Sequence, residues 1–426
     1  MDRPAVTKPG VTILQGDALN LDLPDDSVDL VVTSPPYFGL RSYKDGGEHY
    51  DGQIGGEATP AEFVDALIAA TAEMMRVVKP TGSIWVNLGD KYAGGGMGGY
   101  GGGEWLTHRG GSADTYNRKV RPGVPGKSLI GIPWRYAIRC IDDLGLILRA
   151  EVIWSKPNGL PESVTDRVRR SHEHWFHFTL NPRYYSAVDE IREPHLHGGA
   201  GPTWAERKAA GSPMRHGDTS GGASEGASVP KAGNPLGKIP GSVWTVPTEP
   251  LRVPEELGVD HFAAFPTEWP RRIITGWSPR GVCVECGEGR RPVVDRETVN
   301  AGGARTRPTM GHVTAHPTQR DGREGARRAL ASTITGEACA CPEPTAPTTP
   351  GVILDPFGGT GTTALVAHAL DRHGISNDMS SDYCRLARWR TSDPKQQAKA
   401  ARREFKPPTE QVPGQVELFD LEEGTA

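Results

Sequence analysis

The segment best suited to chemistry is Ser34-Pro35-Pro36-Tyr37, which follows the apolar run Val28–Thr33. Two successive prolines fix the backbone φ near about −65° and remove two N–H donors, which leaves free carbonyls beside a hydroxyl and an aromatic ring. We predict that a strand delivers this rigid turn to the rim of a sheet, where it can hold a flat ring that bears an amino group. A proline-rich turn without chemical function is the alternative interpretation of the motif taken alone.

A second group lies far downstream, where residues 352–363 have the sequence VILDPFGGTGTT and predict a strand, a glycine turn and a helix over Ala364–Leu370. Glycines let the backbone approach a ligand, and a helix N-terminus offers N–H groups to a carboxylate or phosphate. The spacing Gly359-x-Gly361-x-x-Ala364 also fits an NAD site. Asp355 at the strand tip argues against NAD, because a carboxylate repels a pyrophosphate but can pair with the ammonium of an amino acid. S-adenosylmethionine carries such an ammonium.

Asp378 ends the sequence Ile375-Ser376-Asn377-Asp378, which predicts the tip of another strand after the glycine turn. A carboxylate in that position can accept hydrogen bonds from ribose hydroxyls, so we predict Asp378 as a ribose ligand.

Four of the six cysteines lie at the two ends of a polar, arginine-rich segment, residues 281–350. Cys283-Val-Glu-Cys286 has the form of a zinc-binding turn, and Cys339-Ala-Cys341 could supply two more thiolates, although its spacing is shorter than usual. We predict structural zinc, because such a segment has little apolar core of its own. Four unligated thiols in a reducing compartment are the alternative.

The elements that must position these residues alternate along the chain. We predict a helix over 60–78, capped by Thr59, and another over 133–144. Strands are predicted over 11–14, 28–33, 83–88, 147–154 and 172–180. This alternation predicts an α/β fold with a doubly wound, mainly parallel sheet, interrupted by loop and zinc-ribbon-like insertions. The glycine-rich stretch Ala93–Gly111 is one such loop, over the active site or plainly disordered.

Composition limits where a partner could bind. The chain has 426 residues with 48 Lys and Arg against 52 Asp and Glu, a net charge of −4, so any nucleic-acid contact must come from local basic clusters. Candidate clusters are Arg167, Arg169 and Arg170, the 196–240 stretch, and Arg290–Arg328; solvated surface is the alternative for each.

There is no apolar run of about 18 residues and no signal-peptide core, so we expect a cytoplasmic protein that does not enter a membrane.

Together, TSPPY at 33–37 and DPFGGTGTT at 355–363 resemble the paired motifs of DNA amino-methyltransferases of the β arrangement, in which the catalytic motif precedes the cofactor glycines. The resemblance covers residues 11 to about 194 and 240 to about 390. It implies the methyltransferase type of α/β fold, with Ser34, Pro35, Pro36 and Tyr37 as catalytic residues. It also implies that S-adenosylmethionine is held by Asp17, Phe265, Pro266, Asp355, Pro356, Phe357, Gly359, Gly361, Thr362 and Asp378. By position, Asp17 would lie near the adenine, and Phe265-Pro266 would begin a helix that covers the cofactor. Packing on the sheet is the alternative for most of that helix.

The resemblance also implies a division of the chain. The predicted segments are a catalytic half (1–194), a flexible insertion that could read the target (195–240), a cofactor-covering region (241–280), the cysteine-paired insertion (281–350), a cofactor-binding half (351–395) and a polar tail (396–426).

The implied reaction explains the residues of the first motif. An exocyclic amine is a poor nucleophile because its lone pair is delocalised into the ring, and hydrogen bonds to the Ser34 hydroxyl and the Pro35 carbonyl would localise that pair. The base must leave the duplex to be reached, and Tyr37, together with Phe38, could stack on it. Ser at the first position is usual for enzymes that modify cytosine N4, and Asp or Asn for those that modify adenine N6, so we predict cytosine N4 with adenine N6 as the alternative.

The predicted partner is double-stranded DNA, with a restriction endonuclease as a possible second partner. An RNA amino-methyltransferase and a non-catalytic zinc-bearing DNA-binding module are the competing functions. Oligomeric state leaves no mark in one chain.

Overall fold

The computed structural model describes most of the chain. The described residues are 9–39, 44–45, 48–49, 52–93, 124–159, 161–195, 234–259, 264–301, 327–341 and 346–405. These residues exclude all but the first position of the predicted loop Ala93–Gly111, most of the 195–240 insertion, much of the Arg290–Arg328 stretch and most of the tail.

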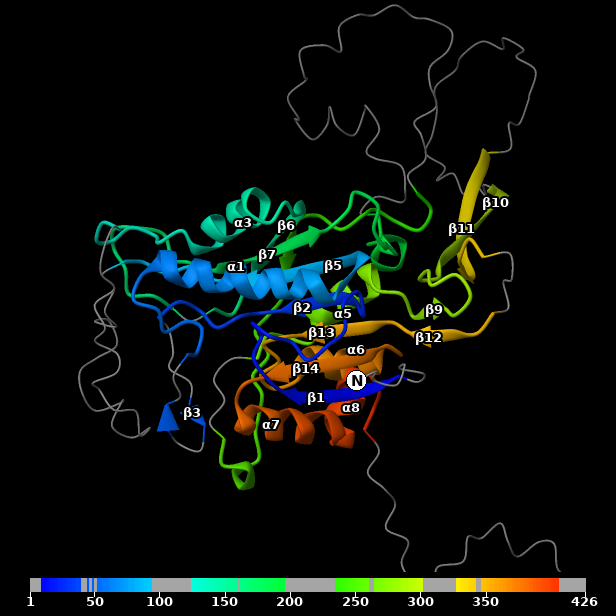
Figure 1. Ribbon diagram of the computed structural model, residues 1–426. Coiled ribbons are helices and arrows are strands. Elements are labelled where there is room, and N and C mark those ends of the chain that lie inside the picture. The colour runs from blue at the N-terminus through cyan, green and yellow to red at the C-terminus, as the bar shows by residue number, and fades with distance from the viewer. Residues whose placement is uncertain are drawn as a thin grey trace, which may run out of the picture.

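A single sheet of eight strands forms the centre of the molecule (Figure 1). Its strands are β1 (Gly10–Gln15), β2 (Val28–Thr33), β5 (Val78–Leu88), β6 (Ile147–Ser155), β7 (His172–Thr179), β8 (Val243–Thr245), β13 (Val352–Asp355) and β14 (His373–Asp378). Their order is β1-β14-β13-β2-β5-β7-β6-β8. Every neighbouring pair is parallel except those that β7 makes with β5 and β6. The predicted mainly parallel α/β sheet is confirmed.

The late strands β13 and β14 lie between the early strands β1 and β2. In the register, Ile353 pairs with Leu30 and Leu354 with Val31. Because parallel strands end at the same edge of a sheet, this order brings Ser34 and Asp355 to one edge although most of the chain separates them.

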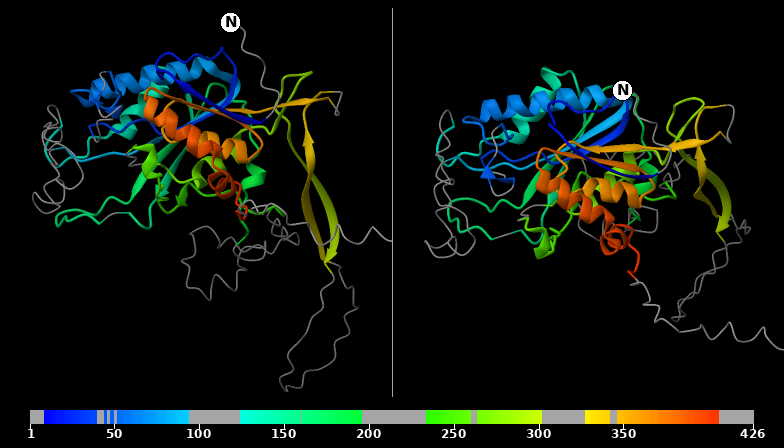
Figure 2. Two further views of the ribbon diagram at one scale, coloured as in Figure 1. Left: turned by 90° about the horizontal axis from the view of Figure 1, so that it is seen from below. Right: turned by 60° about the horizontal axis from the view of Figure 1, so that its bottom comes forward.

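Helices cover both faces of the sheet (Figures 1 and 2). α1 (Pro60–Val77) and α3 (Ile132–Asp142) pack on one face, where Phe63 and Tyr136 join the buried side chains of β2 and β5. α5 (Glu268–Trp277), α6 (Thr362–Ala369) and α8 (Pro394–Ala400) cover the other face, and α7 (Ser381–Ser392) packs along β1 and β14. The predicted cap of α1 is confirmed as a capping box, in which Thr59 and Glu62 each bond the backbone of the other.

One predicted boundary is wrong. We expected Lys79–Gly82 to separate a helix from a strand beginning at Ser83, but β5 begins at Val78 and contains this segment. The pairing of β2 with β5 jumps from Val28–Val78 to Leu30–Ser83, so Lys79–Gly82 forms an irregularity in the strand. A Cβ at Gly82 would lie 2.8 Å from the Asp29 carbonyl oxygen, so only glycine fits this position.

The cysteine-bearing segment forms a separate small structure. β9 (Gly281–Cys283) pairs with β12 (Thr348–Pro350), and β10 (Arg291–Ala301) pairs with β11 (Arg327–Ala338) in a long antiparallel ribbon. Figure 2 shows that this ribbon projects away from the main body. The short elements are β3 (Lys44–Asp45), β4 (Glu48–His49), η2 (Val188–Ile191) and η3 (Glu255–Leu257). Within the described parts of the chain, every helix is too short or too polar to cross a lipid bilayer.

Candidate active site

The two predicted motifs meet at the carboxyl edge of the sheet. The Thr33 hydroxyl, directly before Ser34, donates a 2.6 Å hydrogen bond to Asp355 Oδ1, and 322 positions separate the two residues in sequence. We call this edge, where β2, β5, β13 and β14 end, the catalytic edge.

Asn87 lies next to the first motif and connects its two polar side chains. Its Oδ1 lies 3.3 Å from the Ser34 hydroxyl and 2.8 Å from the Tyr37 hydroxyl, and both hydroxyls can donate to it. Its Nδ2 donates to the carbonyl of His174 on β7, which fixes which end of the amide faces the motif. Because Asn87 accepts from Ser34, the serine oxygen keeps its lone pairs for a donor from outside.

Tyr37 is held by a second acceptor and by close packing. Its hydroxyl lies 2.7 Å from Glu173 Oε2, so its single proton is shared between this oxygen and Asn87 Oδ1. The other carboxylate oxygen of Glu173 pairs with the Lys156 ammonium. That ammonium also lies 4.1 Å from the centre of the Trp154 ring. A Cβ at Gly89 would lie 2.7 Å from the Tyr37 ring, so glycine there gives the ring its space.

Phe38 does not have its predicted role. Its side chain is only 4% exposed and packs against Phe63 of α1, with ring centroids 5.3 Å apart. The ring therefore belongs to the core and cannot stack on a base. Tyr37 remains the aromatic side chain of the motif that is half-buried at the edge.

Asp355 is completely buried at the tip of β13. Its carboxylate accepts hydrogen bonds from the Thr33 and Thr363 hydroxyls and from the Phe357 N–H. Burial raises the pKa of Asp355 to about 7, against the lowering effect of these donors. The carboxylate thus ties β2, β13 and α6 together at the point where the glycine turn begins.

The glycine turn is shaped by backbone conformation. Gly359 and Gly361 have φ of 48° and 72°, in the left-handed region that favours glycine, and Gly361 begins α6 without a side-chain cap. Asp378 stabilises the turn, because its Oδ2 accepts a 2.9 Å bond from the Gly359 N–H. Gly358 is matched to Ser376, since a Cβ there would lie 1.9 Å from the serine oxygen. This contact explains why glycine occupies position 358.

Arg390 also stabilises the glycine turn. Its Nη1 donates to the hydroxyls of Thr360 and Thr362, at 2.5 Å and 2.7 Å. Burial lowers the pKa of Arg390 to about 10, so the guanidinium remains charged at neutral pH.

Most other predicted cofactor residues lie around the same edge. β1 ends beside β14, with Gln15 opposite Asp378, and Asp17 follows directly and accepts from the Leu19 N–H. Pro356 and Phe357 continue the chain from Asp355. Phe265 is half-buried with its ring 5.8 Å from that of Trp175, and Pro266 is buried. The helix after them begins at Glu268, later than predicted.

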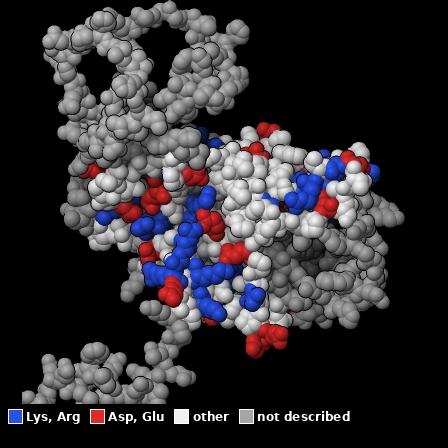
Figure 3. Space-filling model, turned by 180° about the vertical axis from the view of Figure 1, so that it is seen from behind, with Lys and Arg blue, Asp and Glu red and all other residues white. Residues whose placement is uncertain are grey.

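The basic residues predicted near DNA lie between β6 and β7, whose ends meet this edge. Arg167 pairs with Glu162 and stacks 3.8 Å from the Tyr92 ring, and Arg170 lies 3.8 Å from Asp90. Arg169 donates to the Gly159 carbonyl. Figure 3 shows Lys and Arg interspersed with Asp and Glu on the face opposite that of Figure 1.

Sequence reasoning missed Asn87, Glu173 and Lys156. A polar residue near the end of an otherwise apolar strand, as in WVNL at 85–88, was an available signal for Asn87. The other two offered no signal, because their proximity to Tyr37 depends on the pairing of β5, β6 and β7.

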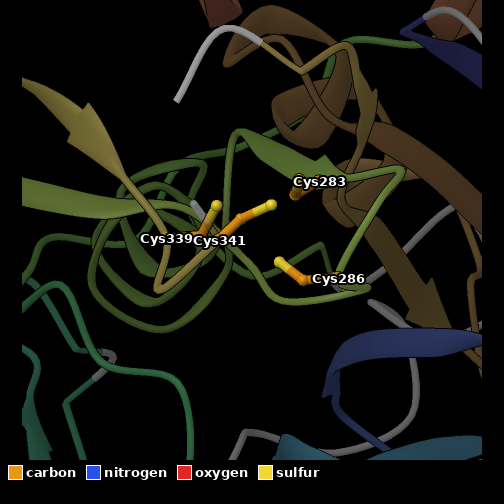
Figure 4. A group of neighbouring side chains, drawn as sticks. All are labelled: Cys283, Cys286, Cys339 and Cys341. Carbon is orange, nitrogen blue, oxygen red and sulfur yellow. The ribbon is translucent and has the colours of Figure 1, made fainter. Parts of the chain in front are cut away.

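The four predicted metal ligands also come together, but at the other end of the sheet. The sulfur atoms of Cys283, Cys286, Cys339 and Cys341 all lie within 4.8 Å of one another and point toward a common centre (Figure 4). Backbone N–H groups, that of Cys286 foremost, lower the pKa of the Cys283 thiol to about 7.

Comparison with known proteins identifies the family. A family model described as DNA methylase matches residues 28–284 and 344–388. The chain belongs to the DNA methylase family. The resemblance to the N4 and N6 DNA amino-methyltransferases is thereby confirmed for the family, and the match leaves out residues 285–343 of this DNA methylase.

Three curated relatives are similar to this DNA methylase. The Type II methyltransferase M.XycI of Xanthomonas campestris pv. cyanopsidis is 42% identical over 200 residues, covering 45% of this chain and 61% of the relative. M.Cfr9I of Citrobacter freundii is 41% identical over 275 residues, covering 62% and 72%. M.SmaI of Serratia marcescens is 29% identical over 383 residues and covers 89% of both chains. The aligned part thus spans about three fifths of the first of these relatives.

Proposed function

We propose that this DNA methylase transfers a methyl group from S-adenosylmethionine to the exocyclic amino group of a base flipped out of double-stranded DNA, with cytosine N4 as the target. The observation that carries the proposal is the Thr33–Asp355 hydrogen bond, which places Ser34–Tyr37 beside the glycine turn. A base held by the first motif and a cofactor held by the second would lie side by side.

The residues of the edge fit the cofactor. A turn of bare backbone at the start of α6 suits the amino-acid part, and the Asp378 carboxylate suits ribose hydroxyls. Asp17, Pro356, Phe357, Gly359, Gly361 and Thr362 would line the site, with Phe265 and Pro266 above them. Asp355 would contribute by anchoring the turn, since its carboxylate is completely buried and accepts bonds from the protein. The Asp378 carboxylate also accepts backbone bonds on both oxygens, but it is only half-buried and can be reached by a ligand. When bound, S-adenosylmethionine supplies an electrophilic methyl group on a sulfonium.

The chain's own task is to localise the lone pair of the target amine. Asn87 Oδ1 accepts a hydrogen bond from the Ser34 hydroxyl, so the serine oxygen can accept an N–H of the amine, and the Pro35 carbonyl can accept the other. Both bonds strengthen as the nitrogen becomes pyramidal and positively charged, which lowers the barrier without a strong base. The nitrogen then releases one proton to water.

Tyr37 would stack on the flipped base and fix its plane. Its ring is positioned by Gly89 on one side, and its hydroxyl by Asn87 and Glu173. Because the ring is already held in one orientation, it loses little conformational entropy when a base binds, which favours stacking.

Two further parts of the proposal concern the target base and the biological setting. Ser34 favours cytosine N4 over adenine N6, although serine can accept from either amine. The relatives are Type II methyltransferases, which supports double-stranded DNA as the substrate and a restriction–modification setting with a cognate endonuclease.

Nucleoside analysis tests the proposal directly. The purified chain is incubated with labelled S-adenosylmethionine and either duplex DNA or RNA, and the digested products are separated by chromatography and mass. We expect N4-methylcytosine from DNA alone. N6-methyladenine as the sole product would refute the cytosine assignment, and label in RNA but not in DNA would refute the DNA assignment.

A further inference from the structure

We infer that Cys283, Cys286, Cys339 and Cys341 form a structural zinc site that holds together a module inserted into this DNA methylase. The inference does not depend on the proposed methyl transfer. It begins from the convergence of four thiols, from two turns far apart in sequence, within 4.8 Å of one another (Figure 4).

Two backbone turns present these thiols. In the first, the Gly287 N–H bonds the Cys283 carbonyl at 2.9 Å, and Gly287 has φ of 71°, so the chain reverses tightly around the sulfur atoms. The second follows β11 directly, at Cys339 and Cys341. The β9–β12 and β10–β11 pairings bring both turns to one place.

The donor set fits zinc in particular. Four thiolates at Zn–S distances of about 2.3 Å stand about 3.8 Å apart in a tetrahedron, so the observed cluster needs only small side-chain rotations to close. Soft sulfur donors favour zinc over calcium or magnesium. Four protein ligands leave no open position for water, which makes the site structural.

The module has little else to stabilise it. Between residues 281 and 347, the buried apolar side chains among those described are Val282, Cys283 and Ala346. Val284, Val293 and Ile334 are each at least 40% exposed. Since so small a core cannot offset the entropy of ordering the chain, metal binding would supply the missing stabilisation.

The module is attached far from the catalytic edge. Tyr185 donates to the Arg290 carbonyl, and the Gly351 N–H to the Arg280 carbonyl, at the edge where β13 begins. Thr348 pairs with Cys283, and the extended chain from Thr348 to Asp355 spans about 23 Å at about 3.3 Å per residue. Residues 285–343 also fall outside the family match, so three of the four ligands belong to the insertion.

Metal analysis of the full-length purified protein tests the inference. We expect about one zinc ion per chain by elemental analysis, and cobalt substitution should give the visible absorption of a tetrahedral thiolate site. Cys283→Ser and Cys339→Ser should each lose most of the zinc. Cys384→Ser is the matched control, because Cys384 is buried under β1 outside the cluster, and it should keep the metal.

Limited trypsin digestion supplies a second readout. Removal of zinc by a chelator should increase cleavage within residues 281–350 while cleavage elsewhere in the chain stays unchanged. A wild-type protein with less than about 0.2 zinc per chain, or equal zinc loss in Cys384→Ser and Cys283→Ser, would overturn the inference. Neither measurement uses cofactor or DNA, so its failure is distinct from failure of the proposed function.

Discussion

The two ends of the central sheet are held together by different interactions. The catalytic edge is a network of hydrogen bonds among strand ends, in which Thr33, Asp355 and Asn87 link residues that lie far apart in the chain. The opposite edge carries four thiols on a segment with almost no apolar core. The geometry of the catalytic edge depends on the register of the sheet. The geometry of the cysteine cluster depends on four ligands that two local turns present.

The two ends can therefore be perturbed separately. The strands between them are rigid, fully packed elements, and about 23 Å of extended chain separates Cys283's partner Thr348 from Asp355. Changes at the catalytic edge should therefore leave zinc content unaltered, and loss of zinc should leave cofactor binding intact.

The largest effect is expected from Tyr37→Ala. Loss of the stacking ring should lower kcat by about 100-fold to 1,000-fold, while cofactor affinity and zinc content stay at wild-type values. Single-turnover methylation, cofactor titration and metal analysis measure the three quantities. A parallel loss of cofactor affinity would show that the base site and the cofactor site are not separate.

Asp355→Asn should change how stability depends on pH. The pKa of Asp355 is about 7 in the folded protein, against about 3.9 in an unfolded chain, so the folded state retains its proton to higher pH. The wild type therefore loses stability as pH rises from about 4 to 7, and the variant should not show this loss, so it should gain about 4 kcal/mol relative to wild type between those limits. Urea unfolding at pH 5 and pH 8 measures the difference, with Asp371→Asn as the exposed control. An identical pH slope in Asp355→Asn and wild type would refute the assignment.

Tyr37→Phe tests the hydrogen bonds that hold the Tyr37 hydroxyl at the catalytic edge. Removing the hydroxyl frees the ring from Asn87 and Glu173 but keeps the stacking surface, so we expect kcat to fall by about tenfold. Tyr184→Phe, at the opposite edge, removes a hydroxyl that bonds Arg149 and should have no effect. Equal rates for the two variants would mean that Tyr37 acts through its ring alone.

The smallest effect is expected from Arg169→Ala. If DNA lies along the catalytic edge, this change should weaken DNA binding by about threefold and reduce the slope of affinity against salt by about one. Arg183→Ala removes an exposed arginine at the opposite edge and serves as the control. A stronger effect from Arg183 would place the DNA near the zinc module.

Local patterns predicted much of the fold correctly. Helical spacing and Thr59 fixed α1, and apolar runs located the central strands, because those signals arise within a few residues. The start of β5 was misplaced, since Lys79–Gly82 resembles a helix stop and only its pairing with β2 makes it part of a strand. Phe38 was misassigned because nothing local distinguishes a ring that packs on Phe63 from one that faces a ligand.

The family, the two motifs and the four thiols were readable from the amino-acid sequence, because they depend on residue type and short spacing. The contacts of Tyr37 with Asn87 and Glu173, the anchoring of the turn by Asp355, and the position of the cysteines at the far edge became apparent in the folded chain. These relations depend on strand order and register. Those are set by packing over the whole sheet and not by any one segment.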